Sequence, residues 1–503
     1  MAGFHVENFG CRAARADGEA VSDRLRAAGL CERGPSEADV VVVNTCSVTA
    51  EADRSARSFI RRAHRLNPEA RILVTGCYAQ RAPEELAGLA GVAAVVGNSH
   101  KALAPEIALS LVREPLVEPA PAGQAAMVTV ASMLVGDVPI WADDRFAHSF
   151  LEEGQTLPGM QTRPNLKIQE GCGNRCTFCV IPQTRGSSRS LSREKVLKQV
   201  EGFVAAGGNE LVLSGINLGR WGRDLDGGFP AGDDSSARWT LATLVRRIFS
   251  DTRLPRLRLS SIEPMDWDRD LIGLMTEFGG TRLALHAHLP LQSGSDAVLR
   301  RMHRRYRPWH YTEKVTQLVE AAGPHLTLGA DVMAGFPGET DAEFEETLDF
   351  VRALPFGYLH LFPFSPRPST RGWALHAEHP VPAAAVEVRM AALRLLAAAK
   401  SRAHREQFVG QQLEAITLHS SAMLQSSGRT AALTENFLPV EIAGRLKANR
   451  LLRIRVTGLK SEGTLEAAEA EPELDQDCAA IMSVRPKSLP LKRSSSPVSL
   501  ASA

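Results

Sequence analysis

The segment Glu170-Gly-Cys-Gly-Asn-Arg-Cys-Thr-Phe-Cys179 places three cysteines within eight residues, close enough for one loop to wrap a metal cluster. Three thiolates hold three irons of a [4Fe-4S] cubane and leave the fourth iron open to chelation by a substrate or cofactor. A structural zinc site uses four ligands in paired modules, and no fourth cysteine or histidine stands near Cys172, Cys176 and Cys179. The spacing therefore predicts an open-iron cluster, with structural zinc or unligated buried cysteines as the alternatives.

From Leu166 onward, apolar strands alternate with helical patterns and predict repeated βα units. Units of this number indicate a partial parallel (β/α) barrel over residues 158–400, closed by a helix from Ala383 to Gln407. Such barrels place their chemistry at the carboxyl ends of the strands, where several polar residues fall in this sequence. The expected strands are Leu211–Leu213, Leu257–Leu259, Leu285–Leu289, Leu326–Val332 and Tyr358–Phe362.

Residues 1–112 show a second α/β pattern. A helical run around Arg54–Arg65 stands between short apolar runs, which are Val40–Val43 before it and Ile72–Val74 and Val92–Val96 after it. This alternation predicts a layered α/β domain. Residues 113–157 lose this pattern and contain Pro-Ala-Pro-Ala-Gly at 119–123, so we expect a linker there.

Three cysteines of the first domain, Cys11, Cys46 and Cys77, each follow a strand-like run. In a parallel α/β layer they would emerge at one carboxyl edge, where they could hold a second cluster. The alternative is three small buried apolar residues, which is the commoner fate of an isolated cysteine. Cys31 and Cys478 have no such setting, and we expect them to be structural or incidental.

Residues 401–470 change character again, with alternating apolar positions in short runs separated by polar turns, which predicts a small antiparallel β-barrel. Residues 408–460 hold seven Lys or Arg against three Glu. This excess indicates either a nucleic-acid surface or an ordinary solvated face. The following residues, 471–503, are rich in Ser and Pro and are expected to form a disordered tail.

The bulk composition is that of a globular chain. Hydrophobic residues make up 44% and charged residues 23% of 503 positions, and the net charge of +1 argues against histone-like binding of nucleic acid. No secretory signal and no run of roughly twenty apolar residues is present, so we expect a cytoplasmic protein without a membrane partner. Disulfides are disfavoured in that compartment, so the eight cysteines are expected to be metal ligands, reactive thiols or buried apolar residues.

Seven further stretches, taken with the first, resemble the methylthiotransferases of the radical S-adenosylmethionine superfamily. The resemblance covers nearly the whole chain to about residue 460. The stretches are Asn44-Thr-Cys-Ser-Val-Thr, Thr75-Gly-Cys-Tyr-Ala-Gln, Ile181-Pro-Gln-Thr-Arg-Gly-Ser-Ser-Arg-Ser190, Leu213-Ser-Gly-Ile-Asn-Leu-Gly219, Ser260-Ser-Ile-Glu-Pro264, His288-Leu-Pro-Leu-Gln-Ser-Gly-Ser295 and Gly335-Phe-Pro-Gly-Glu-Thr340.

The resemblance implies an N-terminal α/β domain, a partial barrel and a C-terminal TRAM domain, in that order. It also implies two [4Fe-4S] clusters, an auxiliary one on Cys11, Cys46 and Cys77 and a radical one on the first trio. S-adenosylmethionine would chelate the open iron and be cleaved to a 5′-deoxyadenosyl radical that activates a carbon–hydrogen bond. A sulfur at the auxiliary cluster, methylated by a second S-adenosylmethionine, would be inserted there. One departure is the segment Arg12-Ala-Ala-Arg-Ala-Asp17, where the family has an Asn and an acidic residue.

Further cofactor or substrate contacts are expected from residues that follow the barrel strands or stand in the cluster loop. Ordinary packing, a tight turn or a buried hydrogen bond is the alternative reading for each of them. Gly215 and Asn217 stand where small residues let a bound amino acid approach the backbone. These candidates are Phe178, Gly215, Asn217, Glu263, Gln292, Ser293 and Asp331.

The segment Gly215-Ile-Asn-Leu-Gly-Arg-Trp-Gly222 resembles the branch that converts N6-threonylcarbamoyladenosine beside the tRNA anticodon to its 2-methylthio derivative. Alternatives are the isopentenyladenosine branch, an aspartate of a ribosomal protein, and a non-catalytic iron-sulfur protein that binds RNA. The favoured reading implies a tRNA anticodon stem-loop and an electron donor such as flavodoxin or ferredoxin as partners. We expect a monomer.

Overall fold

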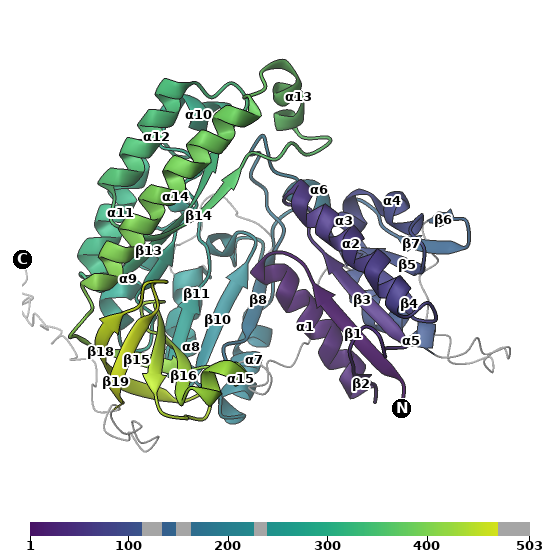
Figure 1. The fold of residues 1–503 in the computed structure, drawn as a ribbon, viewed down its shortest axis with the longest axis horizontal. Coiled ribbons are helices and arrows are strands. Elements are labelled where there is room, and N and C mark those ends of the chain that lie inside the picture. The colour runs from purple at the N-terminus through teal and green to yellow at the C-terminus, as the bar shows by residue number, and fades with distance from the viewer. Residues whose placement is uncertain (113–132, 147–161, 226–238, 471–503) are drawn as a thin grey trace, which may run out of the picture.

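A computed structural model describes residues 1–112, 133–146, 162–225 and 239–470. Figure 1 shows an N-terminal domain in purple and blue, a larger core in teal and green beside it, and a small yellow barrel at the lower end of the core. The order along the chain is the predicted one. Within the described segments, no helix has the length and apolar character needed to cross a membrane.

The N-terminal domain is built on a seven-stranded sheet in the order β2-β1-β3-β4-β5-β7-β6. Val41 and Val43 pack into one buried cluster and Val40 and Val42 into another, so both faces of the sheet are covered. Figure 1 shows α2 and α3 in front of the sheet. Its elements are β1 Gly3–Asn8, α1 Arg12–Ala27, β2 Cys31–Glu32, β3 Val40–Thr45, α2 Ala50–Leu66, β4 Arg71–Gly76, α3 Cys77–Arg81, α4 Pro83–Ala87, β5 Val92–Gly97, η1 Asn98–Leu103 and α5 Ala104–Val112.

Part of the segment expected to be a linker belongs to this sheet instead. β6 Met133–Val135 and β7 Val138–Trp141 form a hairpin, and β7 pairs in parallel with β5. Strands of three and four residues are too short for their periodicity to stand out, so their pairing with β5 decides their place. The expected linker residues 113–132 and 147–157 lie outside the described residues.

The core is a partial barrel, as predicted. A four-stranded sheet, β11-β10-β8-β9, and a three-stranded sheet, β12-β13-β14, are joined by a parallel bridge between Leu257 and Leu283. Its elements are β8 Asn165–Glu170, α6 Ile181–Arg185, β9 Arg189–Ser190, α7 Arg193–Ala205, β10 Glu210–Gly215, η2 Leu218–Arg220, α8 Leu241–Asp251, β11 Arg256–Leu259, η4 Pro264–Asp266, α9 Arg269–Phe278, β12 His286–His288, α10 Asp296–Arg301, α11 Pro308–Ala322, β13 Thr327–Ala334, α12 Asp341–Ala353, β14 Phe356–Pro363, α13 Arg371–Glu378 and α14 Ala383–Glu406.

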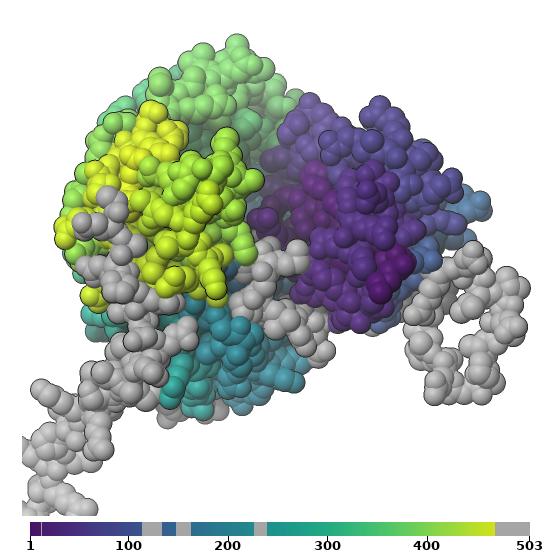
Figure 2. All heavy atoms as spheres, turned by 60° about the horizontal axis from the view of Figure 1, so that its bottom comes forward, coloured from purple at the N-terminus to yellow at the C-terminus, as the bar shows by residue number. Residues whose placement is uncertain are grey.

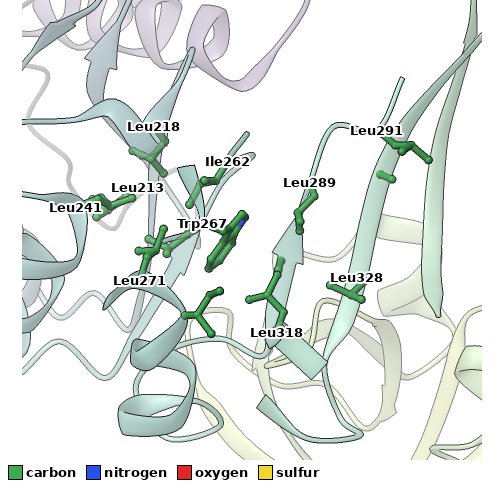
Figure 3. Close-up of a cluster of buried hydrophobic side chains, with 14 of the residues drawn as sticks. Leu213, Leu218, Leu241, Ile262, Trp267, Leu271, Leu289, Leu291, Leu318 and Leu328 are labelled. Atoms are coloured by element: carbon green, nitrogen blue, oxygen red, sulfur yellow. The ribbon is translucent and has the colours of Figure 1, made fainter. Parts of the chain in front are cut away.

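One continuous hydrophobic cluster holds the helices of the core against its strands. Figure 3 shows Trp267 at the centre of this cluster, with Leu213 and Leu289 on either side. All three side chains are at most 1% exposed. The carboxyl ends of the barrel strands are therefore held by rigid packing, which keeps the loops that follow them in place.

Residues 412–470 form a closed five-stranded barrel in the order β15-β16-β17-β19-β18, which confirms the expected C-terminal β-barrel. Its pairs are antiparallel except for β17 with β19, which run parallel. The elements are β15 Gln412–Thr417, α15 Ala422–Ser426, β16 Arg429–Thr434, β17 Pro439–Ala443, β18 Leu451–Leu459 and β19 Leu465–Ala470. The expected tail, 471–503, lies outside the described residues and contains Cys478.

This small barrel is seated against the amino ends of β10 and β11. Arg256 of β11 pairs with Glu414 of β15. Burial opposes the ionisation of Glu210, yet Arg258, Arg163 and Arg256 outweigh it and hold the pKa of this carboxyl well below its usual range. The cysteine loop follows the opposite, carboxyl end of β8, so the small barrel lies away from the cysteines.

Candidate iron-sulfur centre

Cys11, Cys46 and Cys77 follow β1, β3 and β4, which are neighbours in the parallel sheet. Their loops meet closely, because a Cβ on Gly10 would lie 2.7 Å from the Sγ of Cys46. Gly10 also has a φ of +105°, which favours glycine. Burial, followed by the neighbouring Cys77 and Cys11, raises the pKa of the Cys46 thiol to about 12. The predicted convergence of these three cysteines at one sheet edge is therefore confirmed.

The second trio stands on the loop between β8 and α6. The loop begins at Gly171, whose φ is +72° and where an added Cβ would overlap the carbonyl oxygen of Ser187. The amide of Cys172 donates to the carbonyl of Gly186 at 3.0 Å. These contacts fold the loop back on itself. Burial raises the pKa of Cys179 to about 12 and also raises that of Cys172.

Nitrogen donors are aimed at each sulfur of this loop. The amides of Asn174 and Ile181 lie 3.4 and 3.5 Å from the sulfurs of Cys172 and Cys179. The guanidinium of Arg304 lies 3.3 Å from the sulfur of Cys176. Hydrogen bonds of this kind stabilise cluster-bound thiolates, so the donor set suits an iron-sulfur cluster. Such binding would ionise thiols that burial otherwise keeps protonated.

Two buried polar atoms of the predicted cofactor residues have no hydrogen-bond partner among the described residues. They are the Oδ1 of Asn217 and the Oε1 of Gln292. The amide nitrogen of Asn217 lies 3.8 Å from the sulfur of Cys172, and Gln292 has a φ of +68°, which is strained for a side chain of its size. Unpaired buried acceptors, one of them on a side chain that reaches the sulfur of Cys172, suit a bound polar cofactor such as S-adenosylmethionine.

Comparison with known proteins agrees with this geometry. Residues 3–97 match the family described as uncharacterized protein family UPF0004, and residues 166–351 match the radical SAM superfamily. A threonylcarbamoyladenosine tRNA methylthiotransferase of Aquifex aeolicus is 33% identical over 90% of this chain and 99% of its own length. The chain belongs to the radical SAM methylthiotransferases. As a member it is an enzyme of the radical type that uses S-adenosylmethionine and an iron-sulfur cluster.

Two further proteins are similar to this chain, one in sequence and one in fold. A tRNA-2-methylthio-N6-dimethylallyladenosine synthase of Sorangium cellulosum is 34% identical over 83% of this chain and 82% of its own length. Among solved structures, the cobalamin-bound radical S-adenosylmethionine methyltransferase TsrM of Kitasatospora setae aligns with a TM-score of 0.46 and 16% identity. This alignment covers 72% of the present chain and 75% of TsrM.

The other predicted site residues of the methylthiotransferase fall into two groups. Glu263 stands beside the cluster loop, because its carboxylate accepts a 2.6 Å hydrogen bond from Arg304, which also reaches Cys176. Gly215 packs against Gln169, whose side chain accepts from the amide of Asn217 at 2.6 Å. Asn217 and Glu263 are thus candidates that lie at the loop, whereas Gln292 lies beside β13, where its amide donates to the carbonyl of Asp331 at 2.7 Å.

Three candidates have other surroundings. Phe178 packs against the hydrophobic core of the barrel. Ser293 is fully buried, and its hydroxyl pairs with that of Thr347 on α12 at 2.9 Å, so the hydroxyl faces a helix on the outside of the barrel. Asp331 lies on β13 between His288 and His360. Cys31 is exposed beside Met1, away from the cysteine trio.

A buried charged network joins the two cysteine sets, and sequence analysis did not anticipate it. Lys101 and Lys167 both pair with Asp17 of the first domain and Glu170 of the core. Arg185 pairs with the same two carboxylates, at 3.2 and 2.6 Å. The three cations outweigh burial and hold the pKa values of Asp17 and Glu170 below their usual ranges.

Arg185 also reaches the first cysteine trio directly. Its Nε lies 3.2 Å from the sulfur of Cys77. The amide of Asn98 lies 3.3 Å from the same sulfur and donates to the carbonyl of Thr184 at 2.8 Å. Residues 184 and 185 belong to α6, which follows the second cysteine loop. The only signal in the sequence was that Glu170 and Arg185 flank this loop within the stretches that resemble the family.

Proposed function

We propose that this methylthiotransferase acts on tRNA, converting N6-threonylcarbamoyladenosine next to the anticodon to its 2-methylthio derivative. The observation that carries the proposal is the juxtaposition of the two cysteine sets, with Arg185 directly following one loop and contacting Cys77 of the other. Sulfur insertion needs a site that opens a carbon–hydrogen bond beside a site that supplies sulfur. The named activity of the Aquifex aeolicus relative supports this choice of substrate.

The proposal includes two [4Fe-4S] clusters. Cys172, Cys176 and Cys179 would hold the radical cluster with S-adenosylmethionine, and Cys11, Cys46 and Cys77 would hold the auxiliary cluster. Bound there, the cofactors supply a radical for carbon–hydrogen activation and a sulfur for transfer. The chain itself orients these groups. Arg304 and Asn217 direct N–H donors at the sulfurs of Cys176 and Cys172, and Arg185 and Asn98 direct theirs at Cys77.

The proposed partners are a tRNA anticodon stem-loop and a cytoplasmic electron donor such as flavodoxin or ferredoxin, and the enzyme is proposed to act there as a monomer. Arg453 and Arg455 support an RNA partner, because they project from the exposed face of β18 while Ile454 between them is buried. Exposed cations of this kind contact the phosphates of nucleic acids.

The decisive experiment is mass spectrometry of tRNA nucleosides from a strain that lacks the gene. We expect 2-methylthio-N6-threonylcarbamoyladenosine to be lost and N6-threonylcarbamoyladenosine to accumulate, and the wild-type gene to reverse both changes. Loss of the 2-methylthio group from dimethylallyladenosine instead would identify the second candidate, which the Sorangium cellulosum relative supports. Unchanged nucleosides would contradict action on tRNA.

Iron content tests the number of clusters. The anaerobically reconstituted enzyme is expected to hold about eight irons per chain, and a variant with Ala at 172, 176 and 179 about four. The same variant should form no 5′-deoxyadenosine from S-adenosylmethionine, whereas the wild type should. Four irons in the wild type would refute the auxiliary cluster.

A further inference from the structure

Three polar side chains face the inside of the partial barrel on β12, β13 and β14. Asp331 of β13 lies opposite His360 of β14 in the strand register, and their side chains approach to 3.3 Å. His288 of β12 lies 3.4 Å from the same carboxylate oxygen. The neighbouring residues Ala330 and Val332 point the other way, into the hydrophobic cluster. The inner face of this sheet is thus charged where its outer face is apolar.

This set is partly accessible although it lies within the barrel. The side chain of His288 is 6% exposed, that of Asp331 23% and that of His360 60%. The Nε2 of His288 makes no hydrogen bond of good geometry. Burial opposes the ionisation of Asp331, but the two histidines outweigh it and hold the pKa of the carboxyl well below its usual range. The set therefore combines an ionised carboxylate with two imidazoles, and it is accessible to solvent on the side of His360.

Aromatic rings pack against these three polar residues on the side nearer the small barrel. Tyr358 of β14 stacks on His288 at 5.9 Å, with 13° between the planes. It covers Gly329, where any Cβ would overlap its ring. Phe437 of the small barrel lies 5.7 Å from Tyr358 and has a φ of +68°, a strained conformation for a bulky residue. Phe437 thus lies against these rings from the side of the small barrel.

On the side away from the small barrel, these three residues adjoin the residues around the cysteine loop. The Nδ1 of His288 pairs with the hydroxyl of Ser261 at 2.6 Å. Glu263, two residues further on, is bound by Arg304, which contacts Cys176. The backbone carbonyl of Asp331 accepts from the amide of Gln292 at 2.7 Å. The three polar groups therefore lie directly beneath the candidate cofactor residues.

We propose that His288, Asp331 and His360 form the subsite for the threonylcarbamoyl group of the target adenosine, and this inference rests on the proposed function. That group carries a carboxylate, a hydroxyl and urea N–H donors. Imidazole N–H groups bind its carboxylate and hydroxyl, and Asp331 accepts from its urea N–H. A dimethylallyl group offers none of these partners, so it would displace water from these polar groups and leave them unpaired.

Overall sequence similarity does not distinguish the two candidate substrates of this enzyme. Relatives named for threonylcarbamoyladenosine and for dimethylallyladenosine are 33% and 34% identical to this chain. Discrimination between the two substrates must therefore come from particular residues. A polar subsite rejects an apolar analogue far more strongly than an apolar pocket rejects a polar one.

The test compares His360→Leu and Asp331→Asn with a matched control, His310→Leu, on the outer helix α11. Each reconstituted enzyme receives anticodon stem-loops that carry either the threonylcarbamoyl or the dimethylallyl group. We measure kcat/KM for methylthiolation and, separately, the Kd for each RNA. We expect both subsite variants to weaken binding and lower kcat/KM for the threonylcarbamoyl RNA by roughly tenfold or more, with a much smaller change for the other RNA. His310→Leu should match the wild type.

Three results would overturn the inference. They are an unchanged preference in both variants, an equal loss on both RNAs, and a stoichiometric non-iron metal in the wild type that disappears in both variants. The last result would identify a metal site, since the ligand atoms of these residues lie within 4.8 Å of one another. Failure of the wild type to modify the threonylcarbamoyl RNA would instead refute the proposed function, and the two failures are thus distinguishable.

Discussion

Arg185 joins the chemistry of the two cysteine sets through a single side chain. Its guanidinium is fully buried and contacts Asp17, Glu170 and the sulfur of Cys77. Taking these charges out of water is costly, and the network is stable only because each charge has partners of opposite sign. The same contacts pack the first domain against the core, so we infer that Arg185 positions the two loops relative to each other.

We predict that Arg185→Met destabilises the folded protein by about 3–5 kcal/mol, because it leaves two buried carboxylates short of a cation. Chemical denaturation followed by circular dichroism measures this loss. Arg282→Met is a suitable control, because Arg282 donates only to backbone carbonyls at its three hydrogen bonds. Equal stability of Arg185→Met and the wild type would show that the network contributes nothing.

The pH dependence of this network follows from its carboxylates. The pKa values of Asp17 and Glu170 are lower in the folded state than in the unfolded chain. The unfolded chain therefore binds protons first as the pH falls, and the stability from these groups is present above about pH 4.5 and is lost in acid. We expect urea denaturation midpoints of the wild type to fall as the pH drops below this value, and those of Asp17→Asn to fall less steeply.

At the scale of the elements, each cysteine set depends on a loop with a glycine at a positive φ, where a Cβ would overlap neighbouring atoms. Gly171 begins the loop after β8 with a positive φ and no room for a Cβ. Gly173 in the same loop has open space around it. These two glycines give a matched pair for testing loop geometry.

We predict that Gly171→Ala lowers the iron content of the reconstituted enzyme by about half, because the distorted loop no longer holds one of two clusters. Gly173→Ala should keep the wild-type content. Iron analysis with electron paramagnetic resonance checks both. A full complement of iron in Gly171→Ala would show that the loop tolerates the distortion.

The turn that follows β16 contains a buried carboxyl group, that of Glu435. Burial raises the pKa of Glu435 to about 7, and its carboxylate accepts from the amide of Glu414 at 2.8 Å. Between about pH 4.5 and 7 the folded state holds a proton that the unfolded chain has lost, so stability falls as the pH rises, by up to about 1.4 kcal/mol per pH unit. Glu435→Gln should flatten this slope in denaturation curves. An unaltered slope would contradict the assignment.

At the scale of the whole molecule, the small barrel and the N-terminal domain each pack against the core. Figure 2 shows the small barrel in yellow and the N-terminal domain in purple, with the core behind and below them. Arg367, after β14, pairs with Asp53 of the first domain and so adds a second contact between domain and core. Among the described residues, Arg453 and Arg455 of β18 are exposed.

We predict that replacing Arg453 and Arg455 by Ala weakens tRNA binding without changing cluster content. Each lost phosphate contact should reduce the slope of log K against log salt by about one. Filter binding at several salt concentrations measures this slope. Arg247→Ala on α8 is the control, since that arginine pairs with Asp251. An identical salt dependence in the double variant would exclude this face from the RNA interface.

The sequence by itself predicted the three-part architecture and the grouping of six cysteines into two sets of three. Spacing within a loop and strand-to-loop transitions are local signals, and Cys11, Cys46 and Cys77 meet because parallel strands share a carboxyl edge. Tertiary structure decided the pairing of β7 with β5, the contact of Arg185 with Cys77 and the meeting of His288, Asp331 and His360. These partners are 29 or more positions apart in the sequence, and isolated histidines and arginines carry no periodic signal. Only the closure of the sheets brings them within hydrogen-bonding distance.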